Sequence, residues 1–174
     1  MTRLPPPAMH WYLTYRADPR AARLADRHYS RGTIGAVQFA PPGRCLVLLN
    51  REASAVWVTS WPYPEYVLRA WKDAWLCTLF RNESSLLSSE LIREAVAVTR
   101  WRYGESPMSG MITMIDETKI RHKRDPGRCY RKAGFAPVGY TQNGLLVLQL
   151  LPGAMPVASI PNGATLSLFE EVLV

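Results

Sequence analysis

Apolar residues in this chain fall into short runs separated by stretches with helical spacing. Runs over residues 10–15, 34–39, 45–49, 55–59, 76–80 and 111–115 predict strands, because apolar, β-branched and aromatic residues gather there between turn-forming residues. Residues 136–141 and 145–150 predict a closing hairpin that turns at Asn143-Gly144. The run at 76–80 is apolar throughout, as expected for a central buried strand.

Helical spacing appears in the intervening stretches. Asp18-Pro19 is a typical helix start, and the helix it begins places Ala21, Leu24, Ala25 and His28 on one face until Gly32 ends it. Two further stretches predict a short helix through Val67, Trp71 and Trp75 and a long helix over Ser85–Trp101. The buried stripe expected for the long helix is Leu87, Leu91, Ala95, Val98 and Trp101. A last short helix is expected over residues 126–133.

Strands and helices in this order predict an α/β sandwich around one mixed sheet. No composition shift marks a domain boundary, so residues 1–174 are expected to form one domain. Its core spans about residues 10–150, and residues 151–174 form a C-terminal appendage.

The composition narrows the class of protein. The chain has 174 residues, of which 48% are hydrophobic and 20% charged, and this balance is typical of globular proteins. No apolar run approaches the roughly 18–20 residues of a membrane helix, and the first residues do not predict a secretory signal. Cys45, Cys77 and Cys129 lie far apart, without paired zinc-ligand spacing, so a reduced, cytoplasmic protein is expected.

The positive charge is concentrated in one segment. The chain carries +7, and the segment from Lys119 to Lys132 holds +6 of it, with Asp125 as its one acid. Its basic residues are Lys119, Arg121, Lys123, Arg124, Arg128, Arg131 and Lys132. This predicts an anionic partner such as phosphate, a coenzyme or nucleic acid. A solvated basic loop is the alternative.

A motif late in the chain resembles the GNAT family of N-acetyltransferases. It consists of Tyr130, Lys132, Gly134, Phe135 and Gly139, in the spacing Tyr-x-Lys-x-Gly-Phe-x-x-x-Gly. The resemblance implies that Tyr130 lies beside the sulfur of acetyl-CoA and serves as general acid. Residues 81–89 depart from the glycine-rich pyrophosphate loop of that family, since they contain no glycine and include Glu83.

Three further blocks together resemble the bacteriophage Mom group, a divergent branch with a GNAT-like fold. They are His28-Tyr29-Ser30, residues 80–84 (Phe-Arg-Asn-Glu-Ser) and residues 123–135, and the resemblance covers roughly Tyr15 to Leu150. It implies a mixed, mostly antiparallel central sheet with a V-shaped split, flanked by helices. It also implies a transferase that converts adenine in double-stranded DNA to an N6-modified, carbamoylmethyl-type adenine. Such an enzyme protects phage DNA from restriction in the host cytoplasm.

The GNAT-like fold implies that distant residues converge at the split of the sheet. The candidate catalytic residues are His28, Tyr29, Ser30, Asp116 and Tyr130. His28 is a candidate general base, Tyr29 can stack on a base, and Asp116 can accept a proton from an exocyclic amine. The resemblance to the Mom group also implies iron, and His28, Tyr29 and Asp116 are the candidate ligands of Fe(II). Each has a structural alternative: a histidine bonded to backbone, a core tyrosine and a strand-end cap.

Candidate contacts to substrate or DNA follow the same reasoning. They are Arg81, Asn82, Ser106, Lys119, Arg121, Lys123, Arg124 and Arg128. Arg81 can bind phosphate or hold Glu83, Asn82 can read an adenine edge, and both can instead be plain turn residues. Ser109 is a weaker companion of Ser106. Trp61 and Tyr63 are candidates to wedge into a duplex or stack on an extruded base.

Three functions from different classes stay open. The first is a DNA-modifying transferase with double-stranded DNA as partner and an unknown donor. The second is an N-acetyltransferase that uses acetyl-CoA to modify a small amine or a protein. The third is a binding module without catalysis. No membrane partner is expected, and a homodimer is left open.

Overall fold

The computed structural model describes residues 7–62, 70–120 and 125–164. Its strands are β1 (Pro7–Thr14), β2 (Arg44–Asn50), β3 (Ala55–Trp61), β4 (Trp75–Asn82), β5 (Met111–Ile115), β6 (Ala136–Tyr140), β7 (Leu146–Leu150) and β8 (Ile160–Asn162). Its α-helices are α1 (Pro19–Asp26), α2 (Ser88–Tyr103) and α3 (Arg128–Lys132). A 3-10 turn covers Pro152–Ala154. No helix in these ranges is long and apolar enough to cross a membrane.

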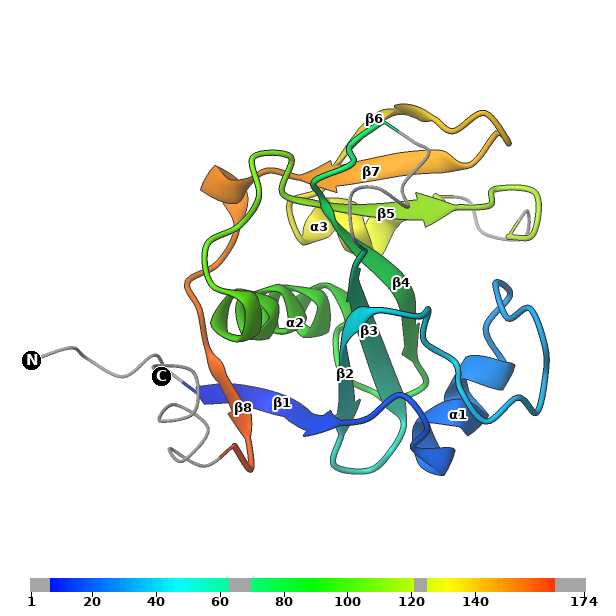
Figure 1. Cartoon of the computed structure of the whole chain (residues 1–174), viewed down its shortest axis with the longest axis vertical. Coiled ribbons are helices and arrows are strands. Elements are labelled where there is room, and N and C mark those ends of the chain that lie inside the picture. The colour runs from blue at the N-terminus through cyan, green and yellow to red at the C-terminus, as the bar shows by residue number, and fades with distance from the viewer. Residues whose placement is uncertain (1–6, 63–69, 121–124, 165–174) are drawn as a thin grey trace, which may run out of the picture.

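The strands form one open sheet in the order β6-β7-β5-β4-β3-β2-β1-β8. The pairs β4–β5 and β1–β8 are parallel, and the others are antiparallel. The chain is therefore an α/β protein with one mixed, mostly antiparallel sheet and three α-helices in its described part (Figure 1).

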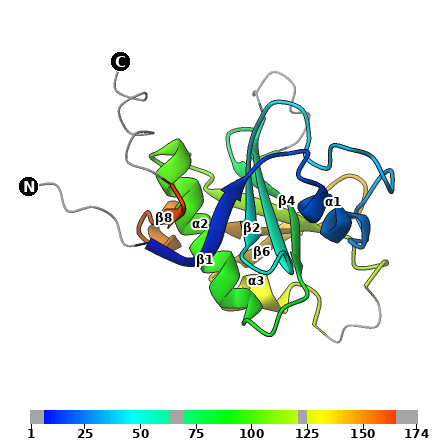
Figure 2. The same ribbon diagram turned by 90° about the horizontal axis from the view of Figure 1, so that it is seen from below.

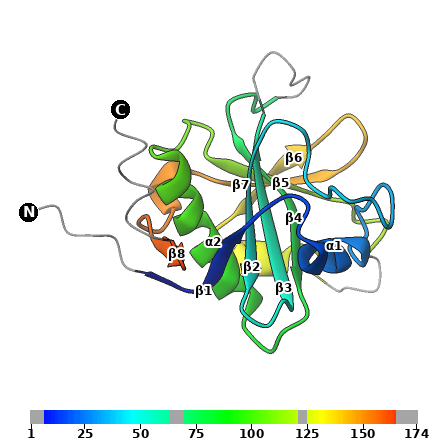
Figure 3. The same ribbon diagram turned by 60° about the horizontal axis from the view of Figure 1, so that its bottom comes forward.

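Helices cover both faces of the sheet because side chains alternate along its strands. Leu46 and Leu48 of β2 point into the larger core, which contains the buried residues of α2. Val47 and Leu49 point the other way and pack with Ala21, Leu24 and Ala25 of α1. Views along the sheet place α2 and α1 on opposite sides of its strands (Figures 2 and 3).

The ends of the two longer helices follow from local chemistry. Asp18 is the N-cap of α1 and accepts a hydrogen bond from the backbone N–H of Arg20 at 2.9 Å, as predicted. Gly104 ends α2 with φ of +78°, a conformation that favours glycine.

The strands predicted at 45–49, 55–59, 76–80 and 111–115 and the hairpin at 136–150 are confirmed. The strand predicted over 34–39 is wrong, because these residues form a loop. The helix after Asp18 ends at Asp26, so Gly32 does not terminate it and His28 lies beyond its last turn.

The helix predicted through Trp71 and Trp75 is also wrong, and Val67 lies outside the described residues. Trp71 has φ of +61°, which is incompatible with a right-handed helix, and Trp75 begins β4. The long helix starts at Ser88 instead of Ser85, and Leu87 precedes it with 58% of its surface exposed. In the predicted appendage, β8 pairs with β1 and extends the sheet.

Candidate functional site

The sheet opens between β4 and β5. The two strands pair in parallel only from Trp75–Met111 to Cys77–Thr113. On the other side of β4, Leu79 pairs with Val58 and Cys77 pairs with Thr59, so Thr78 is an extra residue, a β-bulge. A bulge bends its strand and ends regular pairing. β4 therefore continues with β3 and separates from β5 beyond Cys77.

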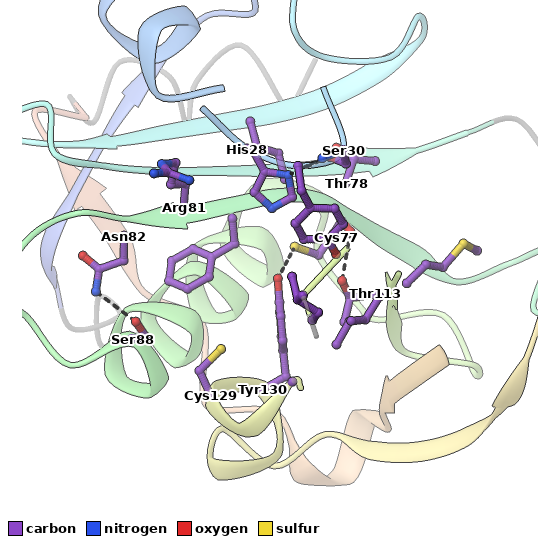
Figure 4. A pocket seen from close by; sticks show the side chains of 17 residues that line it. His28, Ser30, Cys77, Thr78, Arg81, Asn82, Ser88, Thr113, Cys129 and Tyr130 are labelled. Carbon is purple, nitrogen blue, oxygen red and sulfur yellow. Dashed lines mark hydrogen bonds between the residues drawn. The ribbon is translucent and has the colours of Figure 1, made fainter. Parts of the chain in front are cut away.

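This separation produces a cavity of about 430 Å³ (Figure 4). The residues that line it come from the loop after α1, from β4, from Ser88 at the start of α2, from the end of β5, from Ile120, and from Gly127, Cys129 and Tyr130 around the start of α3. The polar side chains among them are His28, Tyr29, Ser30, Cys77, Thr78, Arg81, Asn82, Ser88, Thr113, Cys129 and Tyr130. Of the residues predicted to converge, all except Asp116 line this cavity.

His28 and Ser30 form a hydrogen-bonded pair on one wall. The Nδ1 atom of His28 lies 2.7 Å from the Ser30 hydroxyl and also accepts the Ser30 backbone N–H at 3.2 Å. Nδ1 is thus the acceptor, and the proton of the neutral imidazole lies on Nε2. The Ser30 hydroxyl consequently donates to Nδ1, which makes its oxygen available to accept a proton.

Tyr29 joins this wall to the end of β5. Its ring stacks on the His28 imidazole with centroids 4.5 Å apart. Burial raises the pKa of Tyr29, while a backbone hydrogen bond at Asp116 acts in the opposite direction. Tyr29 is therefore neutral near pH 7, and it approaches Asp116 through the backbone.

Asp116 is not among the residues that line the cavity, although its charge acts on the neighbouring Tyr29. Its Oδ1 accepts the Thr118 backbone N–H at 3.0 Å and the Thr118 hydroxyl at 2.5 Å. The hydroxyl bond is the main cause of a lowered pKa at Asp116. Its Oδ1 therefore caps the turn after β5, and a catalytic role for Asp116 stays a prediction.

Tyr130 reaches the cavity from the opposite wall. Its hydroxyl lies 3.6 Å from the Cys77 sulfur, and its ring packs edge-on against Phe80 and Phe135. Burial raises the pKa of Tyr130 well above its usual value of 10 and that of Cys77 to about 12. Both groups therefore hold their protons near pH 7.

Arg81 is held in a clamp that positions the His28 segment. Its Nε donates to Glu83 at 2.6 Å, and its Nη1 donates to the carbonyl oxygen of Arg27 at 2.6 Å. The Arg27 guanidinium binds the same carboxylate through two bonds of 2.7 Å. These bonds hold the pKa of Glu83 at about 2, with the Arg27 bond as the largest cause. Two arginine side chains thus balance the negative charge of the Glu83 carboxylate, so Glu83 does not repel an anionic ligand as an unpaired carboxylate would.

Asn82 is a structural residue of the turn before α2. Its amide nitrogen donates to the Leu86 carbonyl at 2.8 Å and the Ser88 hydroxyl at 2.9 Å. Its amide oxygen accepts the backbone N–H and the hydroxyl of Ser84. Because both ends of the amide are occupied, the prediction that Asn82 reads an adenine edge is not supported.

Basic residues lie near the cavity on the side of α3. Arg128 and Lys132 of α3 line a second cavity of about 530 Å³ at the start of α2. Ser88, Gly127 and Cys129 line both cavities. Lys119 is exposed on the turn after β5, and its Nζ lies 4.0 Å from Oδ2 of Asp116. The predicted contacts Arg121, Lys123 and Arg124 lie outside the described residues.

Three predicted contacts, Ser106, Ser109 and Trp61, are not among the residues that line the cavity. Ser106 is in the loop before β5, at the end where β4 and β5 are still paired, and its hydroxyl bonds to the Pro107 carbonyl. Ser109 is in the same loop. Trp61 packs against Trp75 and Tyr103, and the Arg44 guanidinium lies 4.2 Å above its ring. Trp61 is therefore a packing residue, and Tyr63 lies outside the described residues.

The predicted iron site lacks support from the geometry. Within residues 7–62, 70–120 and 125–164, no three His, Cys, Asp or Glu residues cluster in a way that could hold a metal. One of the three candidate ligands, Asp116, is occupied at Thr118. An iron ion at His28, Tyr29 and Asp116 would have no third His, Cys, Asp or Glu ligand among the described residues, and this site stays a prediction.

The cavity also contains residues that no local pattern in the sequence indicated. The Thr113 hydroxyl donates to the Cys77 carbonyl at 3.3 Å. The Thr78 hydroxyl is buried at the bulge and has no hydrogen-bond partner among the described residues. A buried unpaired hydroxyl is costly, so it marks a place where a ligand atom would be favoured. These residues can be identified only from how β4 pairs with β3 and β5, and that pairing depends on residues far apart in the sequence.

Comparisons of the chain with models of protein families, with curated proteins and with solved structures give no match.

Proposed function

We propose that this protein is a GNAT-like transferase that attaches a carbamoylmethyl-type group to N6 of adenine in double-stranded DNA and thereby protects phage DNA from restriction. The observation that carries the proposal is the cavity at the split of β4 and β5. It has the His28–Ser30 pair on one wall and the Tyr130 hydroxyl on another. The sequence resemblance to the Mom group supplies the reaction class.

The two walls suit the two proton transfers of this reaction. The exocyclic amine of adenine is weakly nucleophilic and must lose a proton as its nitrogen bonds to carbon. Ser30 Oγ can accept that proton while it passes its own to His28 Nδ1. The leaving group of the donor takes a proton from the Tyr130 hydroxyl, which lies at the opposite wall beside the Cys77 sulfur. One C–N bond forms, the bond to the leaving group breaks, and solvent restores both residues.

The dimensions and charge of the region support a polyanionic substrate. A volume of about 430 Å³ lies within the range of roughly 300–1,000 Å³ common for ligand sites. An adenine in a duplex must leave the base stack to enter such a cavity. The exposed Lys119 and the neighbouring Arg128 lie beside it, where they can bind backbone phosphates.

Mass spectrometry of nucleosides tests the proposal. The protein is expressed in bacteria that carry a plasmid, and the plasmid DNA is digested to nucleosides. Wild type is expected to yield a modified deoxyadenosine, and Ser30→Ala and Tyr130→Phe are expected to reduce it strongly. Ser106→Ala is the matched control, because Ser106 is at the paired end of the strands and should leave the yield unchanged. Unmodified adenine from folded wild-type protein would contradict the proposal.

A second candidate function is acetyl-CoA-dependent N-acetylation of a small amine or protein. The cavity of about 530 Å³ favours it, since Arg128 and Lys132 lie there beside the start of α2 and can hold a phosphorylated coenzyme. The turn before α2 fits less well, because it has no glycine and Asn82 fills it with side-chain bonds. Titration calorimetry with acetyl-CoA distinguishes the candidates, and the absence of heat at millimolar ligand would exclude this one.

A further inference from the structure

The loop over residues 27–43 has no regular secondary structure, and hydrogen bonds of Arg31 and Asp26 hold it in place. The Arg31 guanidinium donates to the Asp26 carboxylate at 2.9 Å and to the carbonyl oxygens of Ala36 and Gln38 at 2.7 and 3.1 Å. The backbone N–H of Gly35 donates to the same Asp26 oxygen at 3.1 Å, with φ of +82° at Gly35. These bonds fix the path of the loop through its polar groups.

Two branched apolar side chains, Ile34 and Val37, stay exposed on this loop, and we call them the tip of the loop. Ile34 is 76% exposed and Val37 is 72% exposed. Single exposed apolar residues are common on protein surfaces, but here two such residues stand three positions apart on a braced loop. Residues 27–43 contain no Asp or Glu, and the nearby Asp26 carboxylate is paired with Arg31. The tip is therefore apolar and free of acidic side chains, which suits contact with a polyanion.

The base of this loop forms part of the candidate site. Ser30 lines the central cavity and also a cavity of about 360 Å³ under the loop, which Thr33 and Gln38 line. Both cavities meet β4 at the bulged Thr78 and at Leu79. The loop extends from the same side of the molecule as the turn after β5, which bears Lys119 (Figures 1 and 3). An apolar tip and a basic residue thus stand on either side of the split.

We infer that Ile34 and Val37 form a wedge that inserts into the DNA duplex beside the target adenine. This inference rests on the proposed function. Proteins that distort DNA commonly insert apolar side chains between base steps, which unstacks the bases and offsets the cost of extruding one of them. A braced loop is suited to this task because it loses little conformational freedom on binding. Extrusion would deliver the adenine to the cavity behind the wedge.

The double variant Ile34→Ser/Val37→Ser tests the wedge against the control Val157→Ser. Val157 is 69% exposed and precedes β8, an edge strand that four strands separate from the β4–β5 split. The assays are formation of modified adenine in a duplex and in a single strand of the same sequence, and binding of the duplex by fluorescence anisotropy. The double variant is expected to lose about tenfold or more of its activity on the duplex and to keep its activity on the single strand within about twofold. The control should match wild type in every assay.

Each outcome bears on the wedge or on the proposed reaction separately. Equal losses on duplex and single strand, or no loss on the duplex, would overturn the wedge. If wild type binds duplex about tenfold more tightly than the double variant but forms no modified adenine, the wedge stands and the proposed reaction fails. The midpoint of thermal unfolding is measured for both variants. A midpoint equal to that of wild type excludes unfolding as the cause of a lost activity.

Discussion

Replacing Glu83 by Gln should destabilise the protein in a way that depends on pH. The Glu83 carboxylate accepts bonds from Arg27 and Arg81 at 2.6–2.7 Å, and these hold its pKa at about 2 instead of 4.5. That displacement corresponds at most to about 3 kcal/mol. The carboxylate is 30% exposed, and screening by water reduces the contribution to about 1–2 kcal/mol. For a chain of this length, the midpoint of thermal unfolding should fall by about 3–6 °C at pH 7.

The sign of the pH dependence follows from the lowered pKa. A carboxylate with a lower pKa in the folded state stabilises that state above its unfolded pKa of 4.5, and the contribution is lost as pH falls toward 2. At pH 3 less than half of the pH 7 contribution should remain. The difference between wild type and Glu83→Gln should therefore shrink from pH 7 to pH 3.

Urea unfolding followed by circular dichroism at both pH values measures this difference. Glu105→Gln is the control, because Glu105 is an exposed carboxylate on the loop after α2. It should match wild type at both pH values. A Glu83→Gln protein as stable as wild type at pH 7, or equally destabilised at both pH values, would refute the clamp.

Three further predictions concern the cavity wall, the closed end of the split and the basic surface. Tyr130→Phe should lower formation of modified adenine by about 10²-fold or more, because the proton donor is lost. Thermal unfolding should change little, since the ring and its packing stay and only the long contact to the Cys77 sulfur goes. Wild-type activity would contradict the role of Tyr130 as an acid. Gly110→Ala should destabilise the fold by about 3 kcal/mol or more in urea unfolding. A Cβ at this position would lie 2.0 Å from the Leu150 carbonyl oxygen, and φ is +64°. A change below about 1 kcal/mol would contradict this prediction. Arg128→Ala should weaken duplex binding for every sequence and reduce the slope of log affinity against log salt by about 1, and an unchanged slope would show that Arg128 contacts no phosphate.

Local patterns were sufficient for the strands at the centre of the sheet. Leu76–Phe80 and Met111–Ile115 are apolar runs bounded by turns, and both are strands in the structure. Asn143-Gly144 lies at the turn of the last hairpin, where the backbone N–H of Thr141 still donates to the Leu145 carbonyl and Gly144 has φ of +81°. The loop therefore has three residues, and its last residue adopts the left-handed conformation that favours glycine.

Two errors arose where tertiary contacts override local preference. Residues 34–39 have the composition of a strand, but β2 is already paired on both sides, and Arg31 satisfies the loop carbonyls instead. Trp71 and Trp75 have helical spacing, but Trp75 is buried as the first residue of β4, and Trp71 adopts a left-handed conformation. Spacing alone does not distinguish these arrangements.

The candidate site was predictable in part. The resemblance placed His28, Tyr29, Ser30, Arg81 and Tyr130 together, and in the structure they line one cavity. The roles predicted for Asn82 and Asp116 lack support because short polar side chains near turns bond most readily to their own backbone. The Thr78 bulge depends on the register of β3 against β4, which is set by contacts far apart in sequence.

The most direct measurement of the central claim is the structure of the protein bound to an oligonucleotide that contains the target adenine. The account predicts an adenine extruded into the cavity between β4 and β5, with its N6 within about 3 Å of Ser30 Oγ. An adenine that stays stacked in the duplex, or that binds elsewhere on the protein, would contradict it.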